Sequence, residues 1–161
     1  SLREPKTWLD NKVSFNFDTQ LITFKNTEVL DAWVKQPEVL FKGKTKRLVY
    51  LSENGTNSPT YSEQDLKEQA AGMAYAMKKI KYLDGIDGFQ YHNWQDNRRE
   101  GGLRIGLRRF PDDKEKPSGI KPVWKVYQDF GTQKENEVYD QYKEMIGIES
   151  WDEIRYKGKI D

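Results

Sequence analysis

The chain has 161 residues, enough for one domain with a hydrophobic core, and its 13% of aromatic residues argues against disorder. Lys and Arg number 27 and Asp and Glu number 26, so the net charge of +1 excludes a chain-wide basic surface for nucleic acid. Cysteine is absent and histidine occurs once, which excludes disulfides, thiolate metal sites, Cys nucleophiles and multi-His centres, and no cofactor is expected. No apolar stretch approaches the roughly 20 residues of a membrane-spanning helix, so no membrane partner is expected either.

The start of the sequence has no initiator Met and no visible signal peptide. Ser1 and Leu2 resemble residues left by an expression vector, so the natural sequence is expected to begin near Arg3. We expect the chain to be part of a longer protein, with any targeting signal in the missing part.

The first forty residues are predicted to hold a hairpin-like loop and one helix. Apolar and polar residues alternate over residues 13–17, which is typical of a short strand, and residues 21–24 are expected to return beside it. Residues 27–40 are predicted to form a helix that Pro37 ends or kinks.

The middle of the chain is predicted to fold as strand, helix and strand. Residues 48–51 are a continuous apolar run, which is typical of a strand buried on both faces. Ser62 to Asp65 has the spacing of a capping box and opens a helix that runs to residue 83. Asp84-Gly85 ends this helix, and residues 86–91 are the next predicted strand.

The last third is predicted to hold an insertion and further helices. Residues 92–120 carry five arginines, and we expect a solvated hairpin whose cations pair with nearby Asp and Glu. Pro122 suits the first turn of a helix over residues 121–130. Residues 135–146 are predicted to form an amphipathic helix, and Ser150 is expected to cap a last turn.

Helices and strands alternate along the chain, which is the order of an α/β protein with a parallel sheet. Only two strands are convincing, whereas a closed (β/α)8 barrel needs eight strands and about 250 residues. The chain alone is therefore too short to close a barrel.

Polar side chains follow both strands of the predicted sheet. Glu53 comes two residues after the apolar run, at the end of the predicted strand, where a carboxylate is costly unless it points into polar surroundings. The second strand runs into the segment 91–96, Tyr-His-Asn-Trp-Gln-Asp, whose aromatic faces suit a sugar ring and whose polar groups suit its hydroxyls. Because catalytic groups of barrel enzymes lie at the carboxyl ends of strands, these two segments form the candidate site.

These segments resemble parts of clan-A glycoside hydrolases. Leu51–Gly55 resembles the end of the seventh barrel strand, residues 90–96 resemble the end of the eighth, and residues 121–124 are similar to the start of the eighth helix. The span from about Lys6 to Phe130 resembles the C-terminal part of a bacterial glycosidase-like barrel family of unknown function. Four segments carry the resemblance: Leu51–Gly55, Glu68–Ala74, Phe89–Asn97 and Gly101–Arg109.

The resemblance implies a fold and a division of the chain. The expected fold class is α/β, with residues 3–130 forming the C-terminal portion of a TIM (β/α)8 barrel, about strands 7–8 and helices 6–8. Residues 131–161 are then a C-terminal helical extension.

The resemblance also implies a fragment of a retaining glycoside hydrolase that acts on a carbohydrate. Glu53 matches the nucleophile, and Trp94 matches the aromatic floor of a sugar subsite. Four further residues are expected to contact the carbohydrate or to shape its site: Tyr91, His92, Asn93 and Asp96. The acid/base Glu belongs to a strand that this chain lacks, so the chain alone is expected to be inactive. A periplasmic or secreted location is implied for such a protein.

Other interpretations stay open at this point. Glu53 can cap a turn, Trp94 can be a packing residue, and His92 can be a satisfied structural histidine. The alternative function is a non-catalytic carbohydrate-binding or structural module. The arginines of residues 98–109 can bind an acidic sugar or a phosphate, but the net charge and the acidic stretches elsewhere disfavour nucleic acid.

Association is expected because the two predicted strands have no neighbours to cover their outer edges. Exposed edges of this kind recruit another chain. We therefore expect the isolated chain to form a homo-oligomer, most simply a two-fold dimer with a large apolar interface.

Overall fold

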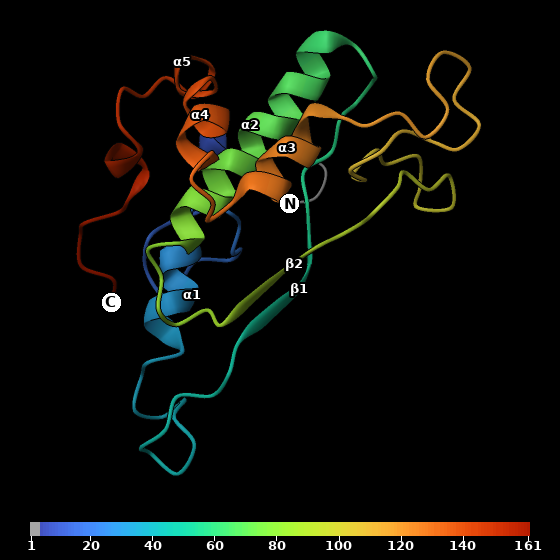
Figure 1. Cartoon of the computed structure of the whole chain (residues 1–161). Coiled ribbons are helices and arrows are strands. Elements are labelled where there is room, and N and C mark those ends of the chain that lie inside the picture. Colours follow the sequence, from blue (N-terminus) through green and yellow to red (C-terminus); the bar gives the residue numbers. More distant parts are fainter. Residues whose placement is uncertain (1–3) are drawn as a thin grey trace.

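The computed structural model describes residues 4–161, so the expectation for Ser1 and Leu2 lies outside the described residues (Figure 1). The elements in chain order are η1 (Thr7–Leu9), α1 (Thr27–Trp33), β1 (Tyr50–Asn54), α2 (Glu63–Ile80), β2 (Gly88–Tyr91), α3 (Pro122–Asp129), α4 (Glu135–Asp140), α5 (Lys143–Ile146) and η2 (Trp151–Ile154). None of the helices in this span is long and apolar enough to cross a membrane.

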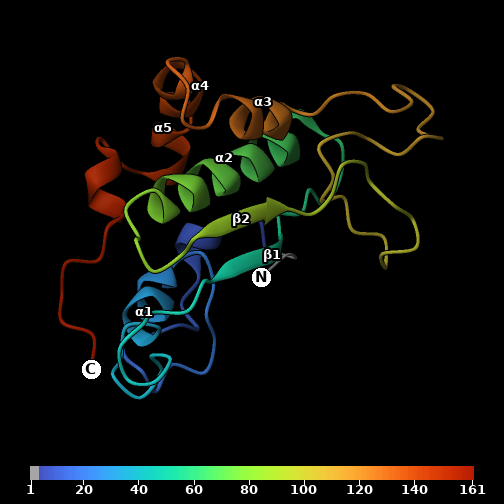
Figure 2. The ribbon, with the colours of Figure 1, turned by 60° about the horizontal axis from the view of Figure 1, so that its bottom comes forward.

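Strands β1 and β2 form a two-stranded parallel sheet, and α2 connects them. The Ser62 side chain accepts a hydrogen bond from the Asp65 N–H, so the predicted cap does begin this helix. Tyr50 pairs with Gly88 and Leu51 with Phe89, and the register then shifts before Asn54. Helix α2 lies along one face of the sheet (Figure 2).

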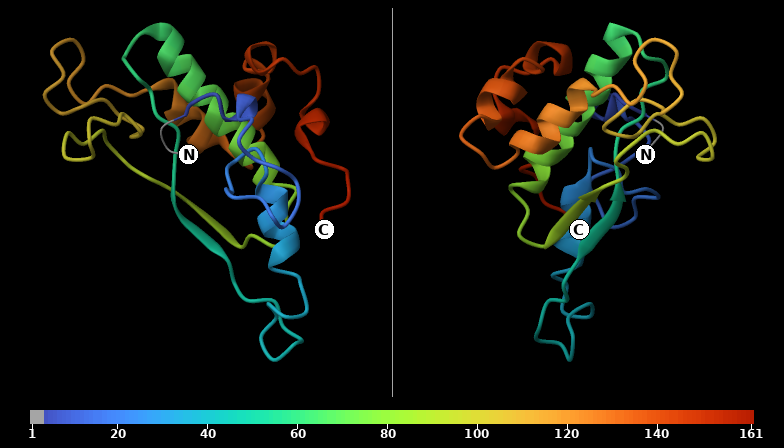
Figure 3. Two further views of the ribbon diagram at one scale, coloured as in Figure 1. Left: turned by 180° about the vertical axis from the view of Figure 1, so that it is seen from behind. Right: turned by 45° about the vertical axis from the view of Figure 1, so that its right-hand side comes forward.

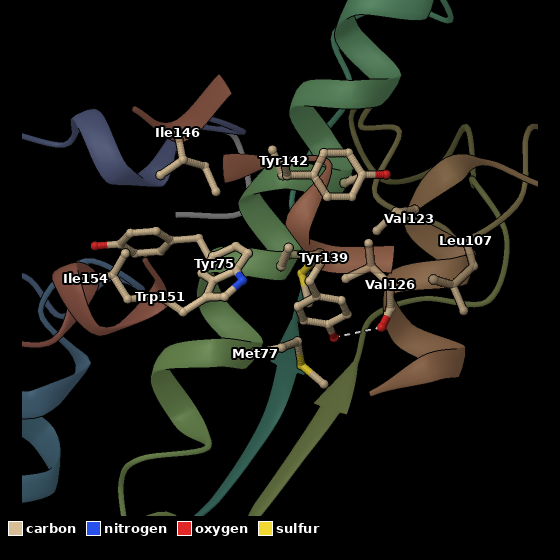
Figure 4. Close-up of a cluster of buried hydrophobic side chains, with 14 residues drawn as sticks. Tyr75, Met77, Leu107, Val123, Val126, Tyr139, Tyr142, Ile146, Trp151 and Ile154 are labelled. Carbon is tan, nitrogen blue, oxygen red and sulfur yellow. Dashed lines mark hydrogen bonds between the residues drawn. The ribbon is translucent and has the colours of Figure 1, made fainter. Parts of the chain in front are cut away.

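The hydrophobic core lies around α2, mostly on the side away from the sheet. Helix α2 supplies small and flexible side chains, and α3, α4, α5 and η2 pack on them (Figure 4). Tyr139 is fully buried, and its hydroxyl donates a hydrogen bond of 2.8 Å to the Val126 carbonyl oxygen. The labelled members of this cluster are Tyr75, Met77, Leu107, Val123, Val126, Tyr139, Tyr142, Ile146, Trp151 and Ile154.

The expected portion of a TIM barrel is wrong. The structure is a small α/β fold with one two-stranded sheet and five α-helices over residues 4–161. A barrel portion would present its helices singly, each packed on the strand before it. Here α3, α4 and α5 gather with α2 into a helical core instead, and this core buries the apolar residues of the C-terminal segment.

Two local predictions about the sheet and its surroundings are also wrong. Leu48 is 68% exposed and Tyr50 is 59% exposed, so the apolar run is not buried on both faces, because α2 covers only one of them. Residues 13–24 form no hairpin. The Asn26 side chain organises this loop instead, donating to the carbonyl oxygens of Ser14 and Leu21 and accepting from the Thr23 N–H.

The insertion of residues 92–120 contains neither a helix nor a strand, although isolated bridges join Gln95, Arg108 and Ile120. It projects from the carboxyl end of the sheet, whereas residues 41–47 project from the opposite end (Figure 3). The insertion is less solvated than predicted, because Arg109 is buried and pairs with Asp113. The exposed pair of Arg98 and Asp112 does follow the expectation.

Candidate functional site

Glu53 lies near the carboxyl end of β1, beside a cavity of about 250 Å³. One wall comes from residues 51–55, and the other from residues 22–24 together with α1. The lining is largely apolar, with Glu53 and Asn54 as polar members on the strand side. The Glu53 carboxylate is exposed and makes no hydrogen bond or ion pair with any residue of the span 4–161. Its oxygens are therefore available to a ligand.

The end of β2 adjoins the end of β1. The His92 N–H donates a hydrogen bond of 2.6 Å to the Asn54 carbonyl oxygen, which ties the two segments together. Beyond this point the His92 ring nitrogen Nε2 lies 3.3 Å from Glu100 Oε2, and the Asn93 amide donates to Glu100 Oε1 at 2.9 Å. The peptide bond between His92 and Asn93 is cis.

Glu100 is a second carboxylate at this end of the sheet, and the sequence analysis missed it. It lies within the insertion, seven residues after Asn93. No periodic pattern marks that loop, so only the fold reveals that Glu100 returns to the strand end. Because His92 and Asn93 already hold its oxygens, Glu100 orients these two side chains.

Trp94 forms an exposed aromatic surface near α3. Its indole is 60% exposed and contacts the Trp124 ring edge to face, with centroids 4.8 Å apart. The Arg108 guanidinium lies 5.9 Å from the centroid of Trp124. An exposed indole held by a second indole is a rigid flat surface of the kind on which a sugar ring stacks.

Tyr91 and Asp96 point into the protein instead of toward a ligand. The Tyr91 hydroxyl donates to the Ile105 carbonyl oxygen at 2.6 Å, and burial together with the Asp96 charge raises the pKa of Tyr91. The Asp96 carboxylate is fully buried and accepts hydrogen bonds from Lys121 at 3.0 Å and Tyr61 at 2.6 Å. Asp96 therefore fixes the insertion, and its oxygens have no room for sugar hydroxyls.

Lys121, Tyr61 and the Gly106 N–H complete this buried network around Asp96. Burial lowers the pKa of Lys121 to about 8, and the attraction of Asp96 opposes that shift. Burial and the hydrogen bond to Asp96 raise the pKa of Tyr61. The contacts of Asp96 with these three partners could not be predicted from the sequence, because the partners lie 10 to 35 residues away from it.

Apart from Tyr91 and Asp96, which are engaged inside the protein, the predicted site residues divide into three groups. Glu53 faces the cavity next to the end of β1, His92 and Asn93 gather around Glu100 at the end of β2, and Trp94 lies on Trp124. Across residues 4–161 no group of three or more His, Asp or Glu side chains is arranged to hold a metal ion.

The model of a family of unknown function, DUF5722, matches residues 1–154. The chain belongs to this family. No curated protein and no solved structure matches the chain. The family brings no activity with it, so the function rests on the residues at the ends of the two strands.

Proposed function

We propose that the chain carries the nucleophile part of a retaining glycoside-hydrolysis site and binds carbohydrate at the carboxyl end of its sheet. The observation that carries the proposal is the Glu53 carboxylate, which is exposed, unpaired within the described span and next to a cavity. The resemblance of Leu51–Gly55 to the nucleophile segment of clan-A enzymes supports it. The exposed indole of Trp94 supports the choice of a sugar as ligand.

In the proposed reaction, a Glu53 oxygen forms a bond to the anomeric carbon while the bond from that carbon to the leaving oxygen breaks with its electron pair. An ordinary glycoside needs a second carboxyl group about 5–5.5 Å away to protonate the leaving oxygen. Glu100 is engaged by His92 and Asn93 and is not assigned that role. We therefore expect no turnover of ordinary glycosides by this chain.

The chemistry suggests a test that needs no acid catalyst. Dinitrophenolate leaves without protonation, so a panel of dinitrophenyl glycosides bearing fluorine on the carbon next to the anomeric carbon should glycosylate the nucleophile and stop there. Intact-mass and peptide mass spectrometry should find one sugar on the peptide that contains Glu53. The Glu53→Gln protein should remain unlabelled, because an amide is a far weaker nucleophile.

The matched control is Glu38→Gln, which changes another exposed glutamate that has no partner among residues 4–161. This control should label as the unchanged protein does. Labelling that survives Glu53→Gln, or that is absent for every sugar of the panel, would contradict the assignment of Glu53.

A non-catalytic carbohydrate-binding function is the second candidate, and the Trp94–Trp124 pair favours it. Trp94→Ala should weaken sugar binding by roughly two- to tenfold, because aromatic stacking contributes about 0.5–1.5 kcal/mol. Trp33→Ala is the control, since Trp33 is also exposed but does not line the cavity beside Glu53. Sugar binding without labelling of Glu53 would favour this second function.

A further inference from the structure

The backbone N–H and C=O groups along the outer edge of β1 are not paired with another strand of residues 4–161. Strand β1 pairs only with β2, and no other strand of residues 4–161 lies against it. Leu48, Tyr50 and Ser52 are exposed along this stretch. Exposed strand edges are templates for another strand.

The residues whose peptide groups face outward can be identified from the register. The Val49 carbonyl oxygen accepts from the Gly88 N–H, and the pairing of Tyr50 with Gly88 and of Leu51 with Phe89 continues this pattern. In a parallel ladder, every second residue directs its N–H and C=O to the neighbouring strand. Val49 and Leu51 therefore direct theirs to β2, while Leu48 and Tyr50 direct theirs to the open edge. Ser52 continues this outward direction up to the register shift, after which Asn54 again bonds to β2.

We propose that this edge pairs with β1 of a second copy of the chain, antiparallel and about a two-fold axis at Tyr50. In this register Tyr50 lies opposite Tyr50 of the second copy, and Leu48 lies opposite Ser52. All of these are outward-facing residues, so each pair exchanges two backbone hydrogen bonds. The result is one continuous four-stranded sheet.

Charge selects this register among the alternatives. Pairing about Tyr50 places Arg47 opposite Glu53 of the second copy, and the two-fold axis repeats this pair. Both side chains are exposed and form no ion pair with any part of the described chain. Moving the two-fold axis by one residue along the strand places Glu53 opposite Val49 or Thr45. Arg47 then has no carboxylate opposite it. Opposite charges that face each other across strands stabilise the pairing, whereas like charges oppose it.

Single-cysteine cross-linking tests this arrangement, and the chain has no cysteine of its own. The Cα atoms of a hydrogen-bonded antiparallel pair lie about 5.5 Å apart, within the range of a disulfide. Under mild oxidation the Tyr50→Cys protein should form a covalent dimer. Leu48→Cys and Ser52→Cys should each form no disulfide alone, because neither places two cysteines opposite each other, and they should cross-link when mixed.

The control for random collision is Leu9→Cys, at an exposed position remote from β1 in the sequence. Cross-linking of Tyr50→Cys at the rate of Leu9→Cys would overturn the proposal. So would self-cross-linking of Leu48→Cys or Ser52→Cys as fast as that of Tyr50→Cys, because the axis would then lie elsewhere.

Charge reversal tests the register without cysteine. Arg47→Glu should weaken dimerisation by roughly tenfold in sedimentation equilibrium, since it places two acidic groups opposite each other. Mixing it with the Glu53→Arg protein should restore association, because the mixed dimer pairs opposite charges at both ends. Unchanged dimerisation of Arg47→Glu, or a mixture no tighter than either variant alone, would refute the pairing of Arg47 with Glu53.

Discussion

At the scale of single residues, the buried ion pair of Asp96 and Lys121 anchors the insertion of residues 92–120. Both side chains have no exposed surface. Asp96 accepts from Lys121, Tyr61 and the Gly106 N–H, while Lys121 also donates to the Arg104 carbonyl oxygen. A buried charge is tolerated only when such partners replace water. This network holds a loop without regular structure against the end of the sheet.

Asp96→Ala should lower the free energy of unfolding by about 3–5 kcal/mol, because it leaves Lys121 buried without its counter-charge. Urea denaturation followed by tryptophan fluorescence measures the change. Asp112→Ala is the matched control, because it removes an exposed carboxylate that pairs with Arg98 in the same insertion. No measurable loss is expected for this control. Equal losses in the two variants would contradict the role assigned to Asp96.

At the scale of elements, Glu135 joins the first turn of α4 to α2. Its carboxylate accepts from Lys78 and Lys81 of the α2 segment and from the Gly131 N–H at 2.6 Å. Burial alone would raise the pKa of Glu135, but the hydrogen bonds from Lys78, Lys81 and Gly131 outweigh it and lower the pKa below its ordinary value of 4.5. The ionised carboxylate is therefore the form that holds the two helices together.

This lowered pKa fixes the direction of a pH effect. A group whose pKa is depressed by folding contributes stability above its ordinary pKa and loses it as the pH falls through the folded value. Glu135→Gln should therefore be less stable than the unchanged protein near neutral pH, and the difference should shrink below about pH 4.5. Denaturant titrations across this range measure both curves.

Glu137→Gln controls for the loss of a carboxylate at the start of α4, since Glu137 is exposed on the same first turn. Its difference from the unchanged protein should be small at every pH. A Glu135→Gln difference that stays constant on acidification would show that ionisation of Glu135 does not couple the helices.

At the scale of the whole molecule, the helices and the sheet differ in how they are supported. Helix α2 is surrounded by α3, α4, α5 and η2 on one side and by the sheet on the other. Within residues 4–161, the sheet has α2 on one face only, and each of its strands is bonded to a single neighbouring strand. Stability is therefore concentrated in the helical core, and the sheet is the part most easily opened.

Hydrogen exchange should reveal this gradient in a dilute sample. The amides of residues 70–77 in α2 should exchange only by global unfolding, and the bonded sheet amides of Leu51 and Gly88 should exchange faster through local opening. The amides of Tyr50 and Ser52 should be the least protected of β1, because they face the open edge. Equal protection of α2 and the sheet would contradict the proposed gradient.

The sequence predicted local structure better than it predicted the fold. The cap at Ser62, the start of α3 at Pro122 and the short turn after Ser150 follow from local chemistry, and the structure confirms them. The exposure of Leu48 and Tyr50 could not be predicted, because an apolar run does not reveal how many layers cover it. The barrel expectation failed for the same reason, since the alternation of strands and helices does not show where the helices pack. Glu100 and the partners of Asp96 come from distant parts of a loop, and only the folded chain brings them together.

The position of Glu53 links the two proposals. The carboxylate lies beside the cavity, and in the proposed dimer it would face Arg47, so a bound sugar and a second copy would compete for it. On the two proposals the equilibria would be linked by mass action: sugar at saturating concentration would weaken the dimer, and raising the protein concentration would lower the apparent affinity for sugar. The open edge of β1 would thereby make the fraction of sites occupied by sugar depend on the concentration of the protein.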